Sequence, residues 1–212
     1  MNQRDFYISI SKEQLSGLPT VVFPGQITVV DTVETANEAL SVLKKETVVG
    51  FDTETKPSFR KGQSNSVALI QVSTLDRCYL FRLKKLGFID GLREFMEDSS
   101  VKKIGLSLHD DFHVLHRGAE FNPDGFVDLQ SLVKEYGISD ISLQKIYGII
   151  FNERISKSQR LSNWEAACLT ASQQSYASID AWACLRIYNY LRRGLFNPDK
   201  SPYKVRAEVV DP

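Results

Sequence analysis

Five short runs of apolar and β-branched residues constrain the fold of this chain most strongly. They are residues 26–30, 47–53, 66–73, 78–83 and 101–106, and runs of this composition and length are typical of strands. Short polar connections join the second, third and fourth runs, which favours an antiparallel meander. Residues 33–46 separate the first two runs and have helical spacing, so the chain is expected to begin strand, helix, strand.

Helices are expected to dominate after Leu106, in contrast to the first half of the chain. The spacing of apolar residues predicts helices over Asp110–Arg117, Leu129–Tyr136, Ser142–Tyr147 and about Ala171–Leu191. The expected fold class is therefore α/β, with a mixed sheet of antiparallel and parallel strands flanked by helices.

The two ends of the chain differ from its middle in their proline content. Residues 1–24 carry Pro19 and Pro24, and residues 196–212 carry Pro198 and Pro202. We expect both ends to be peripheral arms around a single domain of residues 25–195, a size usual for one compact domain.

Composition excludes several classes of protein. Lys plus Arg and Asp plus Glu both count 26, so nucleic-acid binding would need a local basic patch rather than an overall positive charge. The N-terminal residues lack the apolar core of a signal peptide, and no stretch is long enough to span a bilayer. The expectation is a soluble cytoplasmic protein, whose three cysteines form no CxxC pair and should be buried thiols.

Asp52 and Glu54 follow an apolar strand and point to the same side of it, because side chains two apart on a strand share a face. Two carboxylates ~4 Å apart repel by ~4 kcal/mol at an effective dielectric constant of about 20. Such a pair indicates a site that binds something positive. The alternative is a solvated strand end followed by a turn at Pro57.

Tyr176 and Asp180 lie four residues apart on the long C-terminal helix and so share one face of it. A carboxylate among packing residues usually has a partner or a function. Tyr136 and Asp140 have the same spacing, but Gly137 follows Tyr136 and predicts a helix end there. Only the first pair is expected on a continuous helix.

Residues 105–118 contain all three histidines, His109, His113 and His116, beside Asp110 and Asp111. On a helix starting after Ser107, the histidines fall within an arc of about 60°. Asp111 falls on the opposite, apolar arc. Asp110 completes a Ser-x-x-acid capping pattern with Ser107, which is a sufficient structural reason for it.

Three hypotheses fit this segment. The histidines could bind a metal, although no fourth histidine or cysteine pattern supports zinc. A His-Asp phosphohydrolase would need further histidines upstream, and the chain has none before His109. The third hypothesis, which we favour, makes Asp111 alone a metal ligand and leaves the histidines on the surface.

The order of these motifs resembles that of the DEDD exonuclease superfamily: Asp-x-Glu on an early strand, Asp in a mid-chain helix, and Tyr-x-x-x-Asp on a late helix. The tyrosine indicates the DEDDy branch, and the likeness is closest to ribonuclease D and Werner-type exonuclease domains. Residues 105–117 align with their second motif, placing Asp111 at the ligand position, and residues 157–181 resemble their third. Ser107 stands where many relatives have Asn.

This resemblance implies a ribonuclease H-like fold with two Mg²⁺ or Mn²⁺ ions at the edge of its sheet. Asp52 would contact both ions, Glu54 and Asp180 would complete the site of the first, and Asp111 would hold the second. Tyr176 would orient the attacking water. Candidate substrate contacts are Lys157, Arg160 and Trp164, together with Arg60 and Lys61 beside the first motif.

The implied function is 3′-5′ exonucleolytic hydrolysis of nucleic acid, releasing nucleoside 5′-monophosphates from a single-stranded 3′ end. The pattern leaves DNA and RNA equally open. The chain ends soon after the exonuclease-like region, so substrate affinity is expected to be low or supplied by a protein partner. Two alternatives remain: a non-catalytic nucleic-acid-binding or scaffold protein on the same fold, and a phosphohydrolase acting on free nucleotides.

Overall fold

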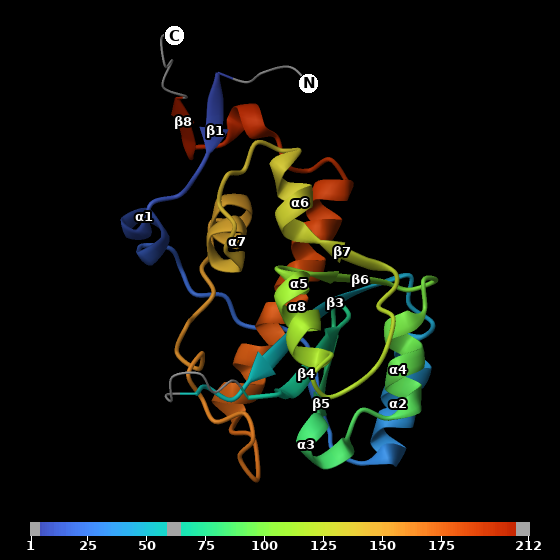
Figure 1. The fold of residues 1–212 in the computed structure, drawn as a ribbon. Helices are drawn as coiled ribbons and strands as arrows, with labels where there is room; N and C mark the ends of the chain where they lie inside the picture. The colour runs from blue at the N-terminus through green and yellow to red at the C-terminus, as the bar shows by residue number, and fades with distance from the viewer. Residues whose placement is uncertain (1–4, 59–64, 207–212) are drawn as a thin grey trace.

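A six-stranded mixed sheet forms the centre of the molecule (Figure 1). The computed structural model describes residues 5–58 and 65–206. The strands lie in the order β2 (Gln26–Val30), β5 (Arg77–Arg82), β4 (Val67–Ser73), β3 (Val48–Thr55), β6 (Lys102–Gly105) and β7 (Phe126–Asp128). β3, β4 and β5 form the expected antiparallel meander. The other pairs are parallel: β2 with β5, β6 with β3, and β7 with β6. The α/β prediction is confirmed. The sequence did not reveal β7, because a three-residue strand carries too little periodicity.

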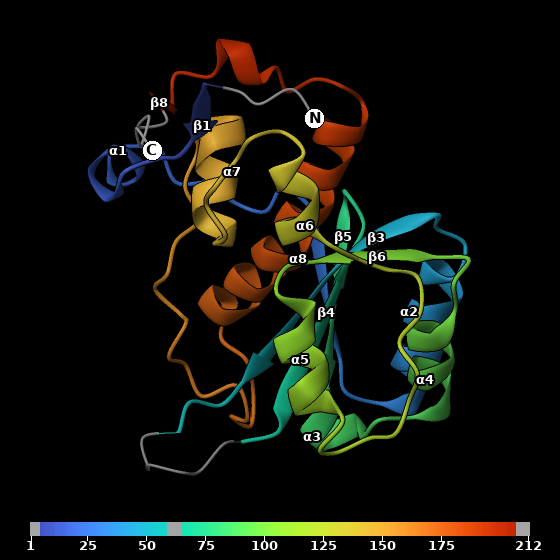
Figure 2. The same cartoon turned by 45° about the horizontal axis from the view of Figure 1, so that its top comes forward.

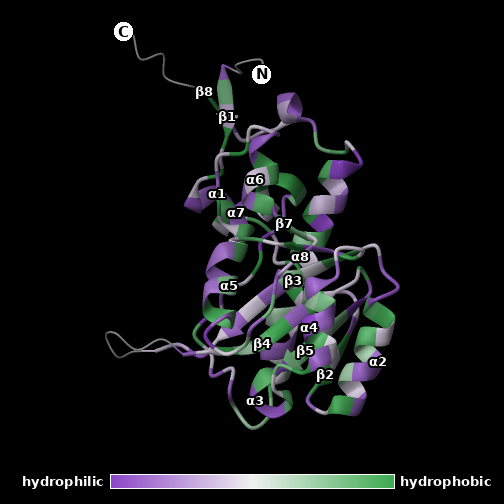
Figure 3. Cartoon of the chain, turned by 45° about the vertical axis from the view of Figure 1, so that its right-hand side comes forward, coloured by the Kyte–Doolittle hydropathy of each residue, from purple (hydrophilic) through white to green (hydrophobic). Residues whose placement is uncertain are grey.

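Two layers of helices cover the sheet. One face packs against α2 (Val33–Leu43) and α4 (Asp90–Glu97), and the other against α6 (Leu129–Lys134), α7 (Leu143–Phe151) and α8 (Ala171–Arg192). The ribbon of α2 alternates between hydrophobic and hydrophilic residues (Figure 3), as a helix with one buried side requires. The remaining helices are α1 (Lys12–Ser16), α3 (Leu83–Leu86), α5 (Leu108–Leu115) and a 3₁₀ turn over Pro198–Lys200.

The first and last described segments of the chain, residues 6–10 and 201–206, lie side by side and contribute to the core. β1 (Phe6–Ile8) pairs antiparallel with β8 (Lys204–Arg206) (Figure 1). Ile8 and Ile10 are 0% exposed, and the carboxylate of Asp140 accepts hydrogen bonds from Ser9 Oγ at 2.9 Å and from Ile10 N at 3.0 Å. The described parts of the two ends therefore differ from the peripheral arms expected from their prolines, because Ile8, Ile10 and Tyr203 belong to the core.

The cysteines agree with the expectation of buried thiols in two cases out of three. Cys78 and Cys184 are buried as predicted, but Cys168 is exposed, because it lies in the irregular segment before α8, where the neighbouring Leu169 is buried instead. Tyr136 lies in the turn after α6 and Asp140 in the irregular segment that follows, so this pair is not on a continuous helix, as predicted. No helix in the described parts of the chain is long and apolar enough to cross a membrane.

Gly50 allows α8 to touch the backbone of the sheet. Figure 2 shows α8 running across its face of the sheet, where a Cβ atom placed on Gly50 of β3 would lie 1.9 Å from the carbonyl oxygen of Ala181. Real non-bonded atoms do not approach so closely, so only glycine fits this position. Ala181 is the neighbour of Asp180, and the contact therefore determines how near that carboxylate comes to β3.

Gly50→Ala should destabilise the protein by at least about 2 kcal/mol, because the added methyl group must push α8 away from β3. Gly118→Ala is the matched control: the nearest heavy atom to its Cβ is Leu115 O, at 3.9 Å, and its effect should stay within about 1 kcal/mol. Urea unfolding followed by the fluorescence of the buried Trp164 and Trp182 measures both. Equal stability of the two variants would contradict the importance of this contact.

Candidate active site

Asp52, Glu54 and Asp180 form a cluster of carboxylates where β3 meets α8. Each contributes a carboxylate oxygen, and these oxygens lie within 4.8 Å of one another. Asp52 and Glu54 stand two apart on β3 and so project to the face covered by α8. Asp180 meets them from the helix and is 8% exposed. The structure thus brings together the two acidic motifs that lie about 130 residues apart in the sequence.

Tyr176 lies one helical turn before Asp180 on α8, and the two side chains influence each other's pKa. Its ring packs against Trp164 with the ring centroids 6.0 Å apart. Burial, followed by the charge of Asp180, raises the pKa of the Tyr176 phenol. The hydroxyl therefore stays protonated at neutral pH and can act as a hydrogen-bond donor.

Asp111 on α5 approaches the cluster from the opposite side. It does not belong to the group of three whose oxygens lie within 4.8 Å, but its Oδ1 accepts a hydrogen bond of 2.5 Å from Thr53 Oγ1. Thr53 stands on β3 between Asp52 and Glu54. The hydroxyl of Thr53 therefore ties the fourth acid to the strand that carries the first two.

The residue that caps the start of α5 is not the predicted one. Ser107 has a left-handed backbone (φ 59°, ψ 35°) and makes no side-chain cap, so the predicted Ser107–Asp110 capping box is wrong. The Ser107 hydroxyl accepts from Gln130 Nε2 at 2.7 Å instead. Asp128 supplies the cap: its carboxylate accepts from Leu108 N at 3.0 Å and from Gln130 N at 2.8 Å.

The three histidines lie on the exposed side of α5, as predicted. His109 approaches only the neighbouring Asp110, at 3.7 Å, and both side chains are at least 90% exposed. His116 stacks on Phe121 with centroids 4.6 Å apart. Among the described residues, the one group arranged to hold a metal contains no histidine, so the His-rich metal site is not formed.

The surroundings of the four acids disfavour their charged forms. Burial is the largest cause in each case: it raises the pKa of Glu54 to about 9, that of Asp111 and Asp180 to about 7, and that of Asp52 well above its usual range. For Asp52 and Glu54, the charges of Asp180 and Asp111 raise the pKa further. None of the four forms an ion pair with a lysine or arginine in the described ranges. The charge of Arg160 lowers the pKa of Glu54, but burial raises it more. A buried set of oxygen donors without an ion-pair partner among the described residues fits a hard divalent cation.

The predicted substrate-binding residues occupy different environments. Lys157 and Arg160 are exposed and line an open cleft of about 370 Å³ together with Asp52, Tyr176 and Asp180. Trp164 is 1% exposed, so it supports the Tyr176 ring instead of facing a substrate. Residues 59–64, which include Arg60 and Lys61, lie outside the described part of the chain.

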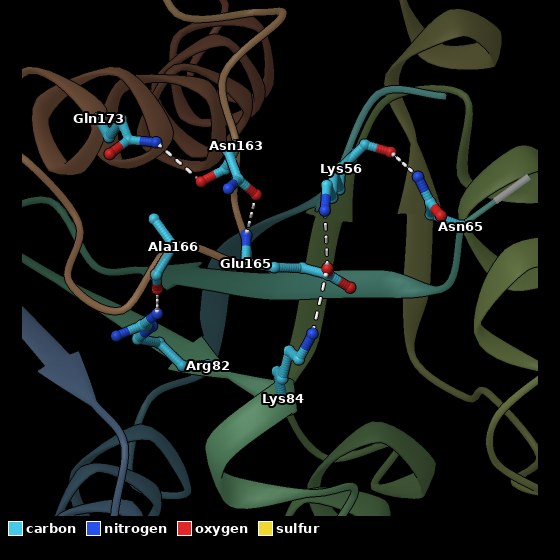
Figure 4. A network of polar contacts seen from close by, with 8 residues as sticks. All are labelled: Lys56, Asn65, Arg82, Lys84, Asn163, Glu165, Ala166 and Gln173. Atoms are coloured by element: carbon cyan, nitrogen blue, oxygen red, sulfur yellow. Dashed lines mark hydrogen bonds and ion pairs between the residues drawn. The ribbon is translucent and has the colours of Figure 1, made fainter. Parts of the chain in front are cut away.

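Polar contacts hold the segment between Asn163 and Gln173 against the sheet (Figure 4). Glu165 forms ion pairs with Lys56 at 3.4 Å and Lys84 at 3.2 Å. Arg82, 4% exposed, donates to the carbonyls of Ala166 and Ala167. Because the buried arginine fixes this segment through its backbone, the chain is anchored between Arg160 and the start of α8.

Sequence reasoning missed Thr53 and Asp128, which position Asp111 without belonging to any acidic motif. Thr53 is hidden within the Asp-Thr-Glu triplet, where a threonine also suits the strand on its own account. Asp128 precedes a predicted helix, and acids at that position are common caps. Its second bond, to the start of α5, depends on the pairing of β6 with β7.

Comparison with known proteins adds the observation that decides the family. A family model described as 3′-5′ exonuclease matches residues 27–195. The chain belongs to the 3′-5′ exonuclease family. Its relatives include the mouse bifunctional 3′-5′ exonuclease/ATP-dependent helicase WRN, 33% identical over 186 residues, and the Drosophila melanogaster exonuclease 3′-5′ domain-containing protein 2, 36% identical over 152 residues. The matches cover 82% and 70% of this exonuclease-family chain but only 13% and 26% of those relatives.

Solved structures confirm the ribonuclease H-like fold of this exonuclease domain. The exonuclease domain of Aedes aegypti Nibbler superposes with a TM-score of 0.70 at 22% identity, covering 82% of this chain and 92% of the other. Escherichia coli ribonuclease D gives a TM-score of 0.71 at 20% identity, with 79% and 44% covered. The fold is therefore shared at low sequence identity.

Metal-free protein should lose stability as the pH rises from about 5 to 9. The acids of the site have folded-state pKa values of about 7 for Asp111 and Asp180 and about 9 for Glu54, above their ordinary values of 3.8 and 4.5. The folded state then binds more protons than the unfolded state across this range, so stability falls with increasing pH. Thermal melts in EDTA at several pH values measure the slope.

The slope should be shallower in Asp52→Asn, because removal of one buried carboxylate relieves the repulsion. It should change less in the exposed control Asp110→Asn, whose charge raises the pKa of Asp111 less than burial does. Divalent metal should raise the melting temperature more at pH 8 than at pH 6, since metal and protons compete for the same oxygens. Identical slopes for the wild type and Asp52→Asn would contradict this account of the site.

Proposed function

We propose that this exonuclease-family chain is catalytically active and hydrolyses nucleic acid from a 3′ end in a reaction that depends on divalent metal. The observation that carries the proposal is the convergence of Asp52, Glu54 and Asp180 within 4.8 Å, with no ion pair from any of them to a lysine or arginine among the described residues. Buried like charges are costly to keep together. A fold that retains them is explained most directly by a function that requires a bound cation.

Asp52, Glu54 and Asp180 would hold one divalent ion, and Asp52 with Asp111 would hold a second. Mg²⁺ and Mn²⁺ fit these oxygen donors. When bound, two such ions supply Lewis acidity that stabilises both the attacking and the leaving oxygen of an in-line phosphoryl displacement. The products would be nucleoside 5′-monophosphates.

Tyr176 would orient the attacking water by a hydrogen bond from its hydroxyl. Its raised pKa makes it a poor general base at neutral pH, so orientation is the role that its chemistry supports. Trp164 packs on the ring of Tyr176 and limits its movement. The exposed Lys157 and Arg160 stand on the same cleft and would contact backbone phosphates.

The substrate would be a nucleic acid with a single-stranded 3′ end. A solved structure of Trypanosoma brucei ribonuclease D, similar in fold to this chain with a TM-score of 0.69, is described as a complex with RNA U12. Lysines and arginines balance the acids in number, so the charge available for phosphate binding is local. We therefore propose that a protein partner or a further nucleic-acid-binding segment strengthens binding.

The direct test is digestion of 5′-labelled single-stranded and duplex DNA and RNA by the purified protein, with Mn²⁺, with Mg²⁺ and with EDTA. The expected result is stepwise shortening from the 3′ end in the presence of metal only, and none with Asp52→Ala. Binding without shortening, unaffected by EDTA, would instead support a non-catalytic nucleic-acid-binding protein. Hydrolysis of free nucleotides alone would support a phosphohydrolase.

Neighbouring acids on α5 provide a matched pair of variants in the same assay. Asp111→Asn should reduce the rate by at least about 100-fold, because the half-buried acid hydrogen-bonded to Thr53 would lose its charge. Asp110→Asn should leave the rate within about twofold, since that side chain is 90% exposed. Loss of activity with Asp110→Asn but not with Asp111→Asn would show that the ligand is the other acid.

A further inference from the structure

Gln71 on β4 has a buried side-chain amide that makes no hydrogen bond to the described residues. The residue is 0% exposed, and neither Nε2 nor Oε1 has a hydrogen-bond partner among the described residues. Leaving a buried polar group unpaired costs about 1–3 kcal/mol. Buried polar groups are nearly always paired, so this exception indicates a partner that engages the amide in another state of the protein.

The position of Gln71 in the sheet identifies that partner. Gln71 is the register partner of Asp52 in the antiparallel pair of β3 and β4. Side chains directly opposed in such a pair project from the same face, with Cβ atoms ~4.5–5.5 Å apart. This face is the one covered by α8, because Leu69 and Leu80, beside Gln71 on that face, belong to the core beneath the helix.

Asp52 is the acceptor directly opposite Gln71, while the next carboxylate on β3, that of Glu54, lies opposite Leu69 and only diagonal to Gln71. Gly50, diagonal to it on β3, has no side chain, and Leu80, opposite on β5, is apolar. The Ser73 hydroxyl donates to the carbonyls of Thr74 at 2.8 Å and Arg77 at 3.1 Å. Asp52 has a carboxylate that can accept further bonds.

We propose that Gln71 is a positioning residue of the metal site. Its Nε2 donates a hydrogen bond to the Asp52 carboxylate in the metal-bound protein and fixes the orientation in which that carboxylate faces the cation. The inference rests on the proposed function and deepens it. Groups that orient a metal ligand commonly change metal affinity by 10- to 100-fold when they are removed.

This role predicts opposite effects on stability and on metal binding. In the metal-free protein the unpaired amide lowers the stability of the fold, so an apolar side chain of similar size should be tolerated or stabilising. In the metal-bound protein the same change removes the support of Asp52. A residue that only fills space would not separate these two properties.

Gln71→Met tests the inference in the full chain, with Leu69→Met as the control. Leu69 is also buried on β4 and lies opposite Glu54, so its variant alters packing at the next position without altering hydrogen bonding. Calorimetric titration with Mn²⁺ alone should show about a 10-fold loss of affinity in Gln71→Met and less than a twofold change in Leu69→Met. The EDTA-treated Gln71→Met protein should melt at or above the wild-type temperature.

Wild-type affinity for Mn²⁺ in Gln71→Met would overturn the inference and leave the proposed function intact. Failure of the wild-type protein itself to bind Mn²⁺ would overturn both. Should Gln71→Met not fold, NMR of the wild-type protein decides. Mg²⁺ should shift the side-chain amide protons of Gln71 more than those of Gln173, whose Nε2 already donates to Asn163 O at 3.3 Å; equal or absent shifts would contradict the proposed bond.

Discussion

The contact between Gly50 of β3 and the backbone of Ala181 on α8 is the constraint on which the site depends. It brings the helix so close to the sheet that a Cβ atom would lie 1.9 Å from a carbonyl oxygen. Asp180 is the next residue on the helix, and Asp52 stands two residues further along the strand on the same face. A backbone contact, which tolerates little displacement, therefore fixes the distance between acids that repel each other.

The same arrangement makes the site unfavourable for the metal-free protein. Burial raises the pKa values of Asp52, Glu54, Asp111 and Asp180, so part of their charge is neutralised by protons when no cation is present. The hydroxyl of Thr53 and the caps provided by Asp128 hold Asp111 in place. Packing and hydrogen bonds thus maintain a cluster of charges that would separate if it were free to move.

Much of the fold was predictable because its signals are local. Composition and periodicity predicted the strand of residues 47–53 and the helix of residues 171–191. The acids on both elements were recognisable as carboxylates in apolar surroundings. Residues whose importance depends on pairing across the sheet could not be predicted in this way. Gly50 looks like any strand glycine until α8 lies on it, and Ser107 satisfied a capping pattern that its left-handed backbone does not permit.

Diffraction from crystals soaked in Mn²⁺, recorded at the manganese absorption edge, tests the central claim most directly. The account predicts anomalous density between the carboxylates of Asp52, Glu54 and Asp180, with a second peak toward Asp111. Density at the histidines of α5 with none at the acid cluster would contradict it, and so would the absence of bound manganese at saturating concentration.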